Sequence, residues 1–225
     1  MFYKIRQQYR MRGWEKMAWV LVRRPENSYK TLTAEEFQVL VLCDGRTKLS
    51  GACMTDEMQQ ILKELIEEGI VELCEKEDPL AEEQYYRYYD NRFVRSAFWS
   101  ITGRCNCRCR HCFMDAPEGR LGELSHEQAV NLIEQMEECG ILRVDITGGE
   151  PFVRKDFWEL IDCIQEHGMA VRDVYTNGRL LTGSVLDEFE KRNLKPEFSI
   201  SFDGTGWHDW MRGVRGAEEA ALEAL

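Results

Sequence analysis

The sequence lacks the two features that would direct a chain into or across a membrane. No stretch of its 225 residues approaches the roughly 18 unbroken apolar residues that a membrane span requires. The amino-terminal stretch MFYKIRQQYRMR has no apolar core of the kind that defines a secretory signal peptide. We therefore expect a globular protein with no membrane partner, and the cytoplasm is the default compartment.

The chain also lacks an excess of basic residues. Its formal net charge is −11, whereas binding to nucleic acid requires a basic surface that neutralises phosphates. The overall charge therefore argues against a nucleic-acid partner. The first 30 residues are an exception, because they contain eight basic side chains: Lys4, Arg6, Arg10, Arg12, Lys16, Arg23, Arg24 and Lys30. This end of the chain could attract an acidic partner or simply form a solvated strand face.

Cysteine, in contrast, is abundant. The chain has nine cysteines and no export signal, and cytosolic thiols are kept reduced, so a disulfide framework is not expected. Four of them lie in the segment RCNCRCRHCF: Cys105, Cys107, Cys109 and Cys112. Packing gives no reason for this density, whereas thiolates on a short loop can surround a soft metal. On metal chemistry alone, a closed four-thiolate zinc site and an iron–sulfur cluster with an open iron are equal alternatives.

Two patterns of secondary structure divide the chain. Alternation of apolar and polar residues around Gly13 predicts two antiparallel strands within residues 1–24. Two capped helices begin after Thr33 and Thr55, and Ile70 and Val71 start a returning strand. We predict a winged-helix-like α+β domain over residues 1–75. The acidic, tyrosine-rich stretch that follows predicts a linker over residues 76–95.

From residue 96 onward, strands alternate with helices. The segments FWSIT, LRVDIT, AVRDVYT and FSISF read as strands, and amphipathic segments lie between them. Short connections of this kind imply a parallel sheet with right-handed crossovers. The sequence therefore predicts an α/β domain over residues 96–225, either an open doubly wound sheet or a partial barrel.

Small and polar residues follow the later strands. The second strand ends in GGEP at residues 148–151, the third in TNG at 176–178 and the fourth in SFDG at 201–204. Ligands of parallel α/β folds bind at the carboxyl ends of strands, so these segments should converge with the cysteine loop. Paired glycines let a ligand approach the backbone, and the polar side chains can bond ammonium, hydroxyl or carboxylate groups.

These motifs together resemble the radical S-adenosylmethionine superfamily. The spacing Cys105-x3-Cys109-x2-Cys112, the GGEP turn and the polar ends of the third and fourth strands carry the resemblance, which covers residues 96–225. The phrases ITGRCNCRCRHC and SISFDGTGWHDWMRG are similar to those of SPASM-type enzymes, which modify peptides and proteins. The resemblance implies a partial (β/α) barrel of the radical SAM type with its first four βα units.

The resemblance also implies the cofactors and their ligands. Cys105, Cys109 and Cys112 would bind a [4Fe–4S] cluster and leave one iron open to S-adenosylmethionine. Cleavage of that cofactor by an electron from the cluster would yield a 5′-deoxyadenosyl radical. Further cofactor contacts would come from the strand ends: Gly148, Gly149, Glu150 and Pro151 at its amino group, and Asn177, Ser201, Asp203 and Arg212 at its ribose or carboxylate.

The sequence departs from the family pattern in two places. Cys107 stands where the family commonly has leucine, so a fourth thiol lies beside the expected ligands. The chain also has four strand–helix units where the family barrel has six, and it lacks the cysteine-rich extension. We expect either a truncated form or a chain that a partner completes. In both cases this chain should not turn over peptide by itself, because missing strands would expose the sheet edge and the radical.

The first domain more loosely resembles the leader-peptide recognition element of peptide maturases, including the phrase LCDG at 42–45. Such an element binds an extended peptide as an added edge strand. A generic winged helix is the alternative.

The resemblance predicts a peptide-modifying oxidoreductase. It would form a thioether, a carbon–carbon crosslink or an epimerised residue in a precursor peptide held by residues 1–75. An electron donor such as flavodoxin or ferredoxin is implied. The alternative is a metal- or redox-sensing winged-helix regulator that binds DNA, and only the basic amino terminus supports it.

Overall fold

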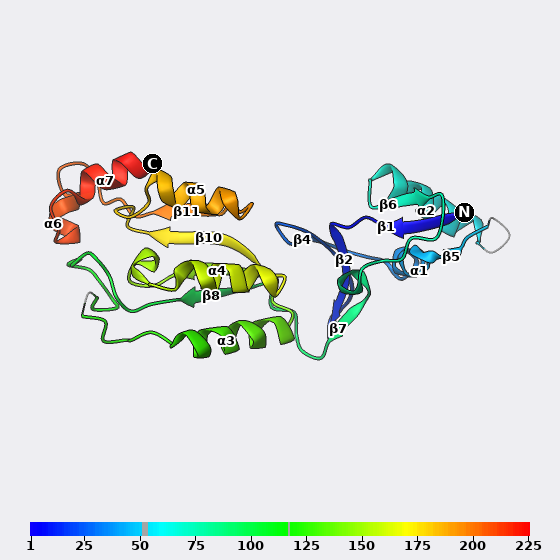
Figure 1. Cartoon of the computed structure of the whole chain (residues 1–225), viewed down its shortest axis with the longest axis horizontal. Helices are drawn as coiled ribbons and strands as arrows, with labels where there is room; N and C mark the ends of the chain where they lie inside the picture. Colours follow the sequence, from blue (N-terminus) through cyan, green and yellow to red (C-terminus); the bar gives the residue numbers. More distant parts are fainter. Residues whose placement is uncertain (51–53, 117) are drawn as a thin grey trace. The chain divides into compact units, whose positions relative to one another are not determined.

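The computed structural model describes residues 1–50, 54–116 and 118–225. The chain forms two compact units, Met1–Phe93 and Val94–Leu225 (Figure 1). Within the described residues, no helix is both long and apolar enough to cross a membrane.

The first unit contains a three-stranded antiparallel sheet of order β5-β1-β6, built from β1 (Phe2–Ile5), β5 (Asp44–Lys48) and β6 (Val71–Cys74). Helices α1 (Ala34–Leu42) and α2 (Asp56–Glu67) pack on a core that includes Ile5, Leu40 and Leu65. Thr33 and Glu36 form the predicted reciprocal cap of α1, and Thr55 caps α2.

A second sheet of order β4-β3-β2-β7 completes this unit. It contains β2 (Tyr9–Trp14), β3 (Met17–Arg23), β4 (Ser28–Thr31) and the short β7 (Arg87–Tyr89). Residues 1–24 thus form three strands, where the sequence pattern predicted two. β2 pairs with β3, whereas β1 joins the other sheet. The separation of β1 from β2 depends on the pairing of β1 with distant strands, which a local alternation pattern does not reveal.

The stretch 76–95, expected as a linker, contributes most of its length to the first unit. It holds the short 3-10 helix η2 (Glu82–Gln84) and β7, which runs parallel to β2. The Gln84 side chain donates hydrogen bonds to the carbonyls of Ile5, Arg6 and Tyr9. These buried bonds fix the segment, because a backbone carbonyl left unsatisfied inside the fold would be costly.

Half of the eight basic residues of the amino terminus form ion pairs within the first unit. Ion pairs join Lys4 to Glu72 and Asp78, Arg6 to Glu72, Arg10 to Glu83, and Lys30 to Glu36 and Glu68. The Arg12 guanidinium is buried and donates to three backbone carbonyls. Part of the positive charge at this end is therefore offset by carboxylates of the same unit.

The second unit is a four-stranded parallel sheet of order β11-β10-β9-β8, which confirms the predicted α/β class. Its strands are β8 (Ser96–Ser100), β9 (Arg143–Thr147), β10 (Ala170–Thr176) and β11 (Glu197–Ile200). Its helices are α3 (His126–Glu138), α4 (Phe157–Glu166), α5 (Gly183–Lys191), α6 (His208–Arg212) and α7 (Ala217–Ala224). The short 3-10 helix η3 (Pro151–Val153) follows β9.

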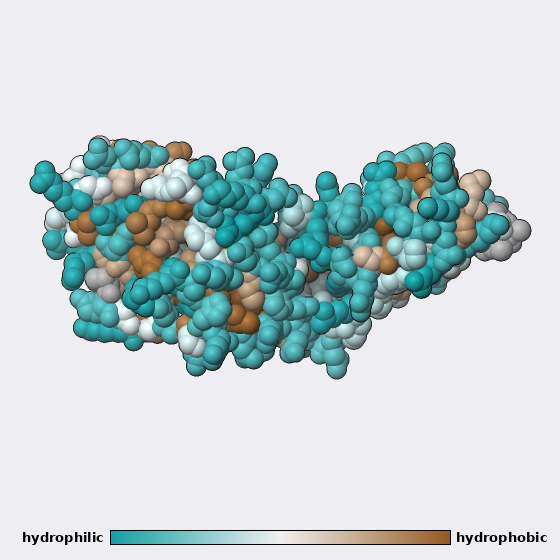
Figure 2. Space-filling view, viewed as in Figure 1, coloured by the Kyte–Doolittle hydropathy of each residue, from teal (hydrophilic) through white to brown (hydrophobic). Residues whose placement is uncertain are grey.

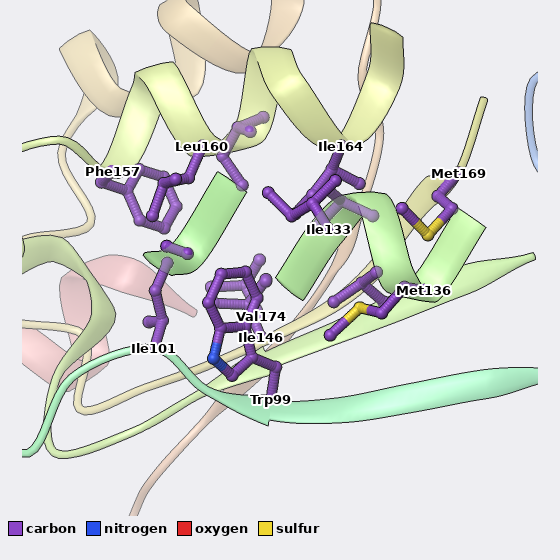
Figure 3. Close-up of a cluster of buried hydrophobic side chains, with 14 of the residues drawn as sticks. Trp99, Ile101, Ile133, Met136, Ile146, Phe157, Leu160, Ile164, Met169 and Val174 are labelled. Carbon is purple, nitrogen blue, oxygen red and sulfur yellow. The ribbon is translucent and has the colours of Figure 1, made fainter. Parts of the chain in front are cut away.

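The core of this unit lies on one face of the sheet. Trp99, Ile146 and Val174 from three strands pack beneath Leu160 and Ile164 of α4 (Figure 3). The other face of the sheet carries a mixture of side chains: Phe98 and Tyr175 are exposed, whereas Asp145 and Asp173 are buried. Figure 2 shows apolar surface still visible on this unit, and its exposed large apolar residues include Phe98, Phe113, Trp207 and Trp210.

Candidate functional site

The cysteine loop follows β8 and is held on one side by the turn after β9. The Gly149 amide donates to the Thr102 carbonyl at 2.9 Å, and the Glu150 amide donates to the Arg104 carbonyl at 2.8 Å. A Cβ atom built on Gly149 would lie 2.2 Å from the Arg104 carbonyl oxygen. The paired glycines therefore let the turn lie directly against the start of the cysteine loop.

The end of α6 holds the other side of the same loop. The amides of Arg108 and Arg110 donate to the carbonyls of Arg212 and Met211 at 2.8 and 2.9 Å. These two bonds flank Cys109, so its position is tied to a helix that lies about one hundred residues later in the chain. Sequence spacing alone does not reveal this attachment.

A cavity of about 250 Å³ opens between the loop and the strand ends. All four clustered cysteines line it, together with five of the eight residues expected to contact the cofactor: Gly148, Gly149, Asn177, Ser201 and Arg212. Tyr175 and His111 line it as well. The position of Tyr175 on the accessible face near the end of β10 follows from strand alternation, which could have identified it.

Glu150, Pro151 and Asp203 are not among the residues that line this cavity. Glu150 is fully buried and accepts hydrogen bonds from the Thr176 hydroxyl at 2.9 Å, the Asn177 amide at 2.8 Å and the Phe152 amide at 3.3 Å. Burial raises the pKa of this carboxyl, and the hydrogen bonds oppose that shift. In this structure Glu150 joins the ends of β9 and β10, and contact with a cofactor amino group stays a prediction.

Asn177 and Asp203 also have partners within the protein. The Asn177 side-chain amide donates to Asn106 Oδ1 at 2.7 Å and to Cys105 Sγ at 3.7 Å, while Arg179 donates to the Asn106 carbonyl at 2.8 Å. Asp203 binds the Arg212 guanidinium. Neither Asn106 nor Arg179 was assigned a role by the sequence analysis. Asn106 lies within the phrase ITGRCNCRCRHC and could have been singled out there, whereas Arg179 lies just beyond the TNG segment and belongs to no motif.

The clustered thiols influence each other's ionisation. A hydrogen bond from the Cys107 thiol is the largest cause that lowers the pKa of Cys105 to about 7 and that of Cys109 to about 5. Arg212 also lowers the pKa of Cys109. The pKa of the Cys107 thiol is raised, because it donates to both neighbours and is buried. The site thus pairs two readily ionised thiols with one that keeps its proton.

The residues present fit a thiolate-bound cluster with a small organic ligand beside it. Two thiols are poised to ionise, and a thiolate is the form that binds metal. The glycine turn brings backbone to the cavity wall without side chains. Within the described residues, no three His, Cys, Asp or Glu side chains converge as for a single metal ion. A multi-iron cluster binds each thiolate through a different iron, so it does not need such convergence.

The parallel α/β fold with a cysteine loop at its strand ends points to a class of iron–sulfur proteins, and comparison with known proteins identifies the family. The sequence profile of the radical SAM superfamily matches residues 99–225, so this chain belongs to that superfamily. Its cofactors are a [4Fe–4S] cluster and S-adenosylmethionine.

Several relatives share the second unit. The mycofactocin maturase MftC of Mycobacterium tuberculosis strain H37Rv is 36% identical over 129 residues, which cover 56% of this chain and 32% of that protein. The subtilosin biosynthesis protein AlbA of Bacillus subtilis is 32% identical over 123 residues, 54% of this chain and 27% of that protein. An AdoMet-dependent heme synthase of Oleidesulfovibrio alaskensis is 37% identical over 131 residues, which cover 56% of this chain and 33% of that protein. The matched region thus spans about a third of the length of each of these curated relatives.

Solved structures show the same fold over more of the chain. Streptococcus suis SuiB bound to S-adenosylmethionine superposes with a TM-score of 0.61 at 18% identity, covering 99% of this chain and 53% of SuiB. SuiB bound to its precursor peptide SuiA gives a TM-score of 0.60 at 18% identity, with the same coverage.

Proposed function

We propose that this chain carries the S-adenosylmethionine-cleaving part of an enzyme that modifies a ribosomally made precursor peptide. The convergence of the cysteine loop, the glycine turn and the ends of β10 and β11 on one cavity carries the proposal. When bound, the cluster and S-adenosylmethionine supply a 5′-deoxyadenosyl radical that abstracts hydrogen from the peptide. The likeness to MftC, AlbA and SuiB supports a peptide as the substrate class.

Each group of residues at the cavity then has a distinct role. Cys105, Cys109 and Cys112 hold the cluster, whereas Cys107 donates a hydrogen bond to two of these thiolates. Gly148 and Gly149 leave room for the cofactor beside the loop. Asn177, Ser201 and Arg212 provide further polar contacts to the cofactor. Glu150 does not line the cavity and instead joins the ends of β9 and β10 through its hydrogen bonds. A flavodoxin or ferredoxin would supply the electron.

The test measures the cofactor product and the peptide product separately. The protein, at the full length that its gene encodes, is reconstituted anaerobically, reduced with dithionite and mixed with S-adenosylmethionine. Synthetic peptides from short reading frames beside the gene are the substrates. We expect 5′-deoxyadenosine by chromatography. Mass spectrometry should show loss of two hydrogen atoms for a thioether or a carbon–carbon crosslink, or uptake of one deuterium in D₂O for epimerisation.

The products separate the possible failures. Formation of 5′-deoxyadenosine with no change in any peptide would refute the peptide as substrate. Tight binding of duplex DNA without 5′-deoxyadenosine would favour the sensing regulator. The ion pairs that already engage Lys4, Arg6, Arg10 and Lys30, half of the basic residues at the amino terminus, argue against that outcome.

We also propose that the first unit binds the leader segment of the precursor. The hairpin strands β2 and β3 lie inside their sheet, so neither provides an edge to which a peptide strand could be added. The other sheet has β5 as an edge. The amides of Asp78 and Leu80 already donate to the carbonyls of Gly45 and Asp44 at its start, so the peptide would pair beside its end, which Leu49 and Ser50 follow directly. These two residues line a mostly apolar groove of about 610 Å³ with Met1, Tyr3, Met54 and the side of α2. A peptide strand beside the end of β5 could place apolar side chains in this groove.

Ile66→Ser is the matching experiment for the leader site. Ile66 lines the groove and is 39% exposed, so its truncation should remove an apolar anchor with little effect on the core. We expect roughly tenfold weaker binding of synthetic leader peptides to the whole chain by calorimetry. Val41→Ser is the control, because Val41 on α1 is 45% exposed and is not among the residues that line the groove. Equal weakening by both variants would contradict the assignment.

A further inference from the structure

Arg212 makes a contact that the proposed cofactor roles do not explain. It is the last residue of α6 and is 9% exposed. Its Nη1 donates a hydrogen bond to Cys109 Sγ at 3.7 Å. The sequence resemblance assigned Arg212 to the ribose or carboxylate of S-adenosylmethionine, whereas in the structure one arm of the guanidinium is directed at a thiol of the cysteine loop.

Asp203 holds the rest of the guanidinium. Arg212 Nη2 donates to Asp203 Oδ1 at 3.2 Å, and Arg212 Nε lies 2.7 Å from Asp203 Oδ2 in an ion pair. The Asp203 amide donates to Nδ1 of the fully buried His208 at 3.0 Å, which ties the loop after β11 to α6. Two sides of the guanidinium are thus fixed by the carboxylate, and the remaining Nη1 is free to face sulfur.

The backbone fixes the distance between Arg212 and Cys109. The two amides that flank Cys109 in the loop, those of Arg108 and Arg110, donate to the carbonyls of Arg212 and Met211. Gly213 follows with φ of 65°, and a Cβ there would lie 2.4 Å from the Arg108 carbonyl oxygen. The helix end and the loop therefore pack without intervening side chains, and Arg212 has little freedom to withdraw.

A buried positive charge beside a cluster ligand has a predictable effect on the reduction potential of the cluster. Reduction adds an electron to the cluster, so its negative charge grows, and a cation or hydrogen-bond donor at a ligand sulfur stabilises the reduced form more than the oxidised form. The low exposure of Arg212 limits screening by water and salt. Asp203 offsets part of the positive charge, while it fixes the direction of the donor.

We propose that Arg212, oriented by Asp203, is a positioning residue that donates to the Cys109 sulfur and raises the reduction potential of the cluster. This inference rests on the proposed role of Cys109 as a ligand. It assigns the SFDG segment and α6 a function in electron acceptance, in addition to any contact with S-adenosylmethionine. The cluster is the acceptor of the external electron, so the effect would determine how readily a weak donor can start the reaction.

The experiment is a redox titration of reconstituted Arg212→Gln without S-adenosylmethionine. Electron paramagnetic resonance reports the reduced cluster at each potential. At the midpoint potential of the unmodified protein, we expect the ratio of reduced to oxidised cluster to fall about tenfold, which corresponds to 59 mV for one electron. Arg212→Lys keeps the positive charge but loses the planar guanidinium that can bond Asp203 and Cys109 at once. The reduction potential should therefore shift less, in the same direction.

Arg110→Gln is the matched control. It removes the same charge one residue from Cys109, but Arg110 is exposed and its guanidinium lies over the Trp210 ring at 4.4 Å. Its potential should stay close to that of the unmodified protein. An unchanged potential in Arg212→Gln with full iron content, or an equal shift in Arg110→Gln, would overturn the inference. Retention of the cluster in Cys109→Ala would instead refute the ligand assignment, so the two failures are distinct.

If Arg212→Gln does not retain iron, Arg212→Lys supplies the comparison. It must then have a lower potential than Arg110→Gln. A potential equal to that of the control would refute the proposal, and a change confined to the affinity for S-adenosylmethionine would return Arg212 to the role of a cofactor contact.

Discussion

Alanine at Cys105, Cys109 or Cys112 is expected to abolish the iron and sulfide content of the anaerobically reconstituted chain, whereas Cys107→Ala should retain it. Each of the three proposed ligands binds one iron of the cluster, and loss of a thiolate leaves that iron without a protein donor. Cys107 differs because it lies outside the Cys105-x3-Cys109-x2-Cys112 spacing, at a position where the superfamily commonly has leucine. The difference between the variants should therefore be nearly complete loss against near-complete retention.

Iron and sulfide analysis, together with visible absorption, measures this contrast directly. Cys107→Ala is the matched control, because it removes a cysteine from the same loop. Like the proposed ligands, Cys107 lines the cavity, and its side chain is buried. Circular dichroism of each variant before reconstitution shows whether the fold is kept. Cluster loss in Cys107→Ala, with retention in Cys109→Ala, would exchange the roles assigned to these two residues.

The second unit shows how far strand periodicity can predict a site. Gly148, Asn177 and Ser201 come from three different strand ends, and they line one cavity because parallel strands end at the same edge of a sheet. The sequence could predict that convergence without knowing any contact. It could not predict the burial of Glu150, because that depends on a hydroxyl and an amide supplied by the next strand.

Long-range attachments account for the other differences. The bonds from Arg108 and Arg110 to the end of α6 join segments with no shared motif, and they direct Arg212 toward Cys109. In the first unit, β1 pairs with β5 and β6 and not with its neighbour β2. Local alternation predicts that a strand exists, whereas its partners depend on which distant edges bury the most apolar surface.

The glycine turn provides a test of whether the site depends on a close backbone approach. Gly149→Ala is expected to lower both stability and cluster content, although it changes no proposed ligand. The new Cβ would lie 2.2 Å from the Arg104 carbonyl oxygen and 3.0 Å from Cys105 Cβ. Because the nearer atom belongs to the backbone, rotation of a side chain cannot relieve the overlap, and the loop must move.

The expected loss follows from that movement. Overpacking of this kind costs about 2 kcal/mol, which lowers the melting temperature by roughly 4–8 °C for a chain of this size. Displacement of Arg104 also moves Cys105, the next residue, so the iron content after reconstitution should fall severalfold. Scanning calorimetry of the apoprotein and iron analysis of the reconstituted protein measure the two effects independently.

Gly183→Ala supplies the control for this variant. Gly183 begins α5, and a Cβ built there would have no atom within 4 Å. Its replacement should leave cluster content unchanged and should maintain or slightly raise stability, since alanine reduces the freedom of the unfolded chain. Equal behaviour of the two variants would show that the loop adapts to a methyl group at position 149. A drop in cluster content without a drop in apoprotein stability would instead place the constraint in the loaded site, because the loop would then tolerate the methyl group until the cluster requires the original position of Cys105.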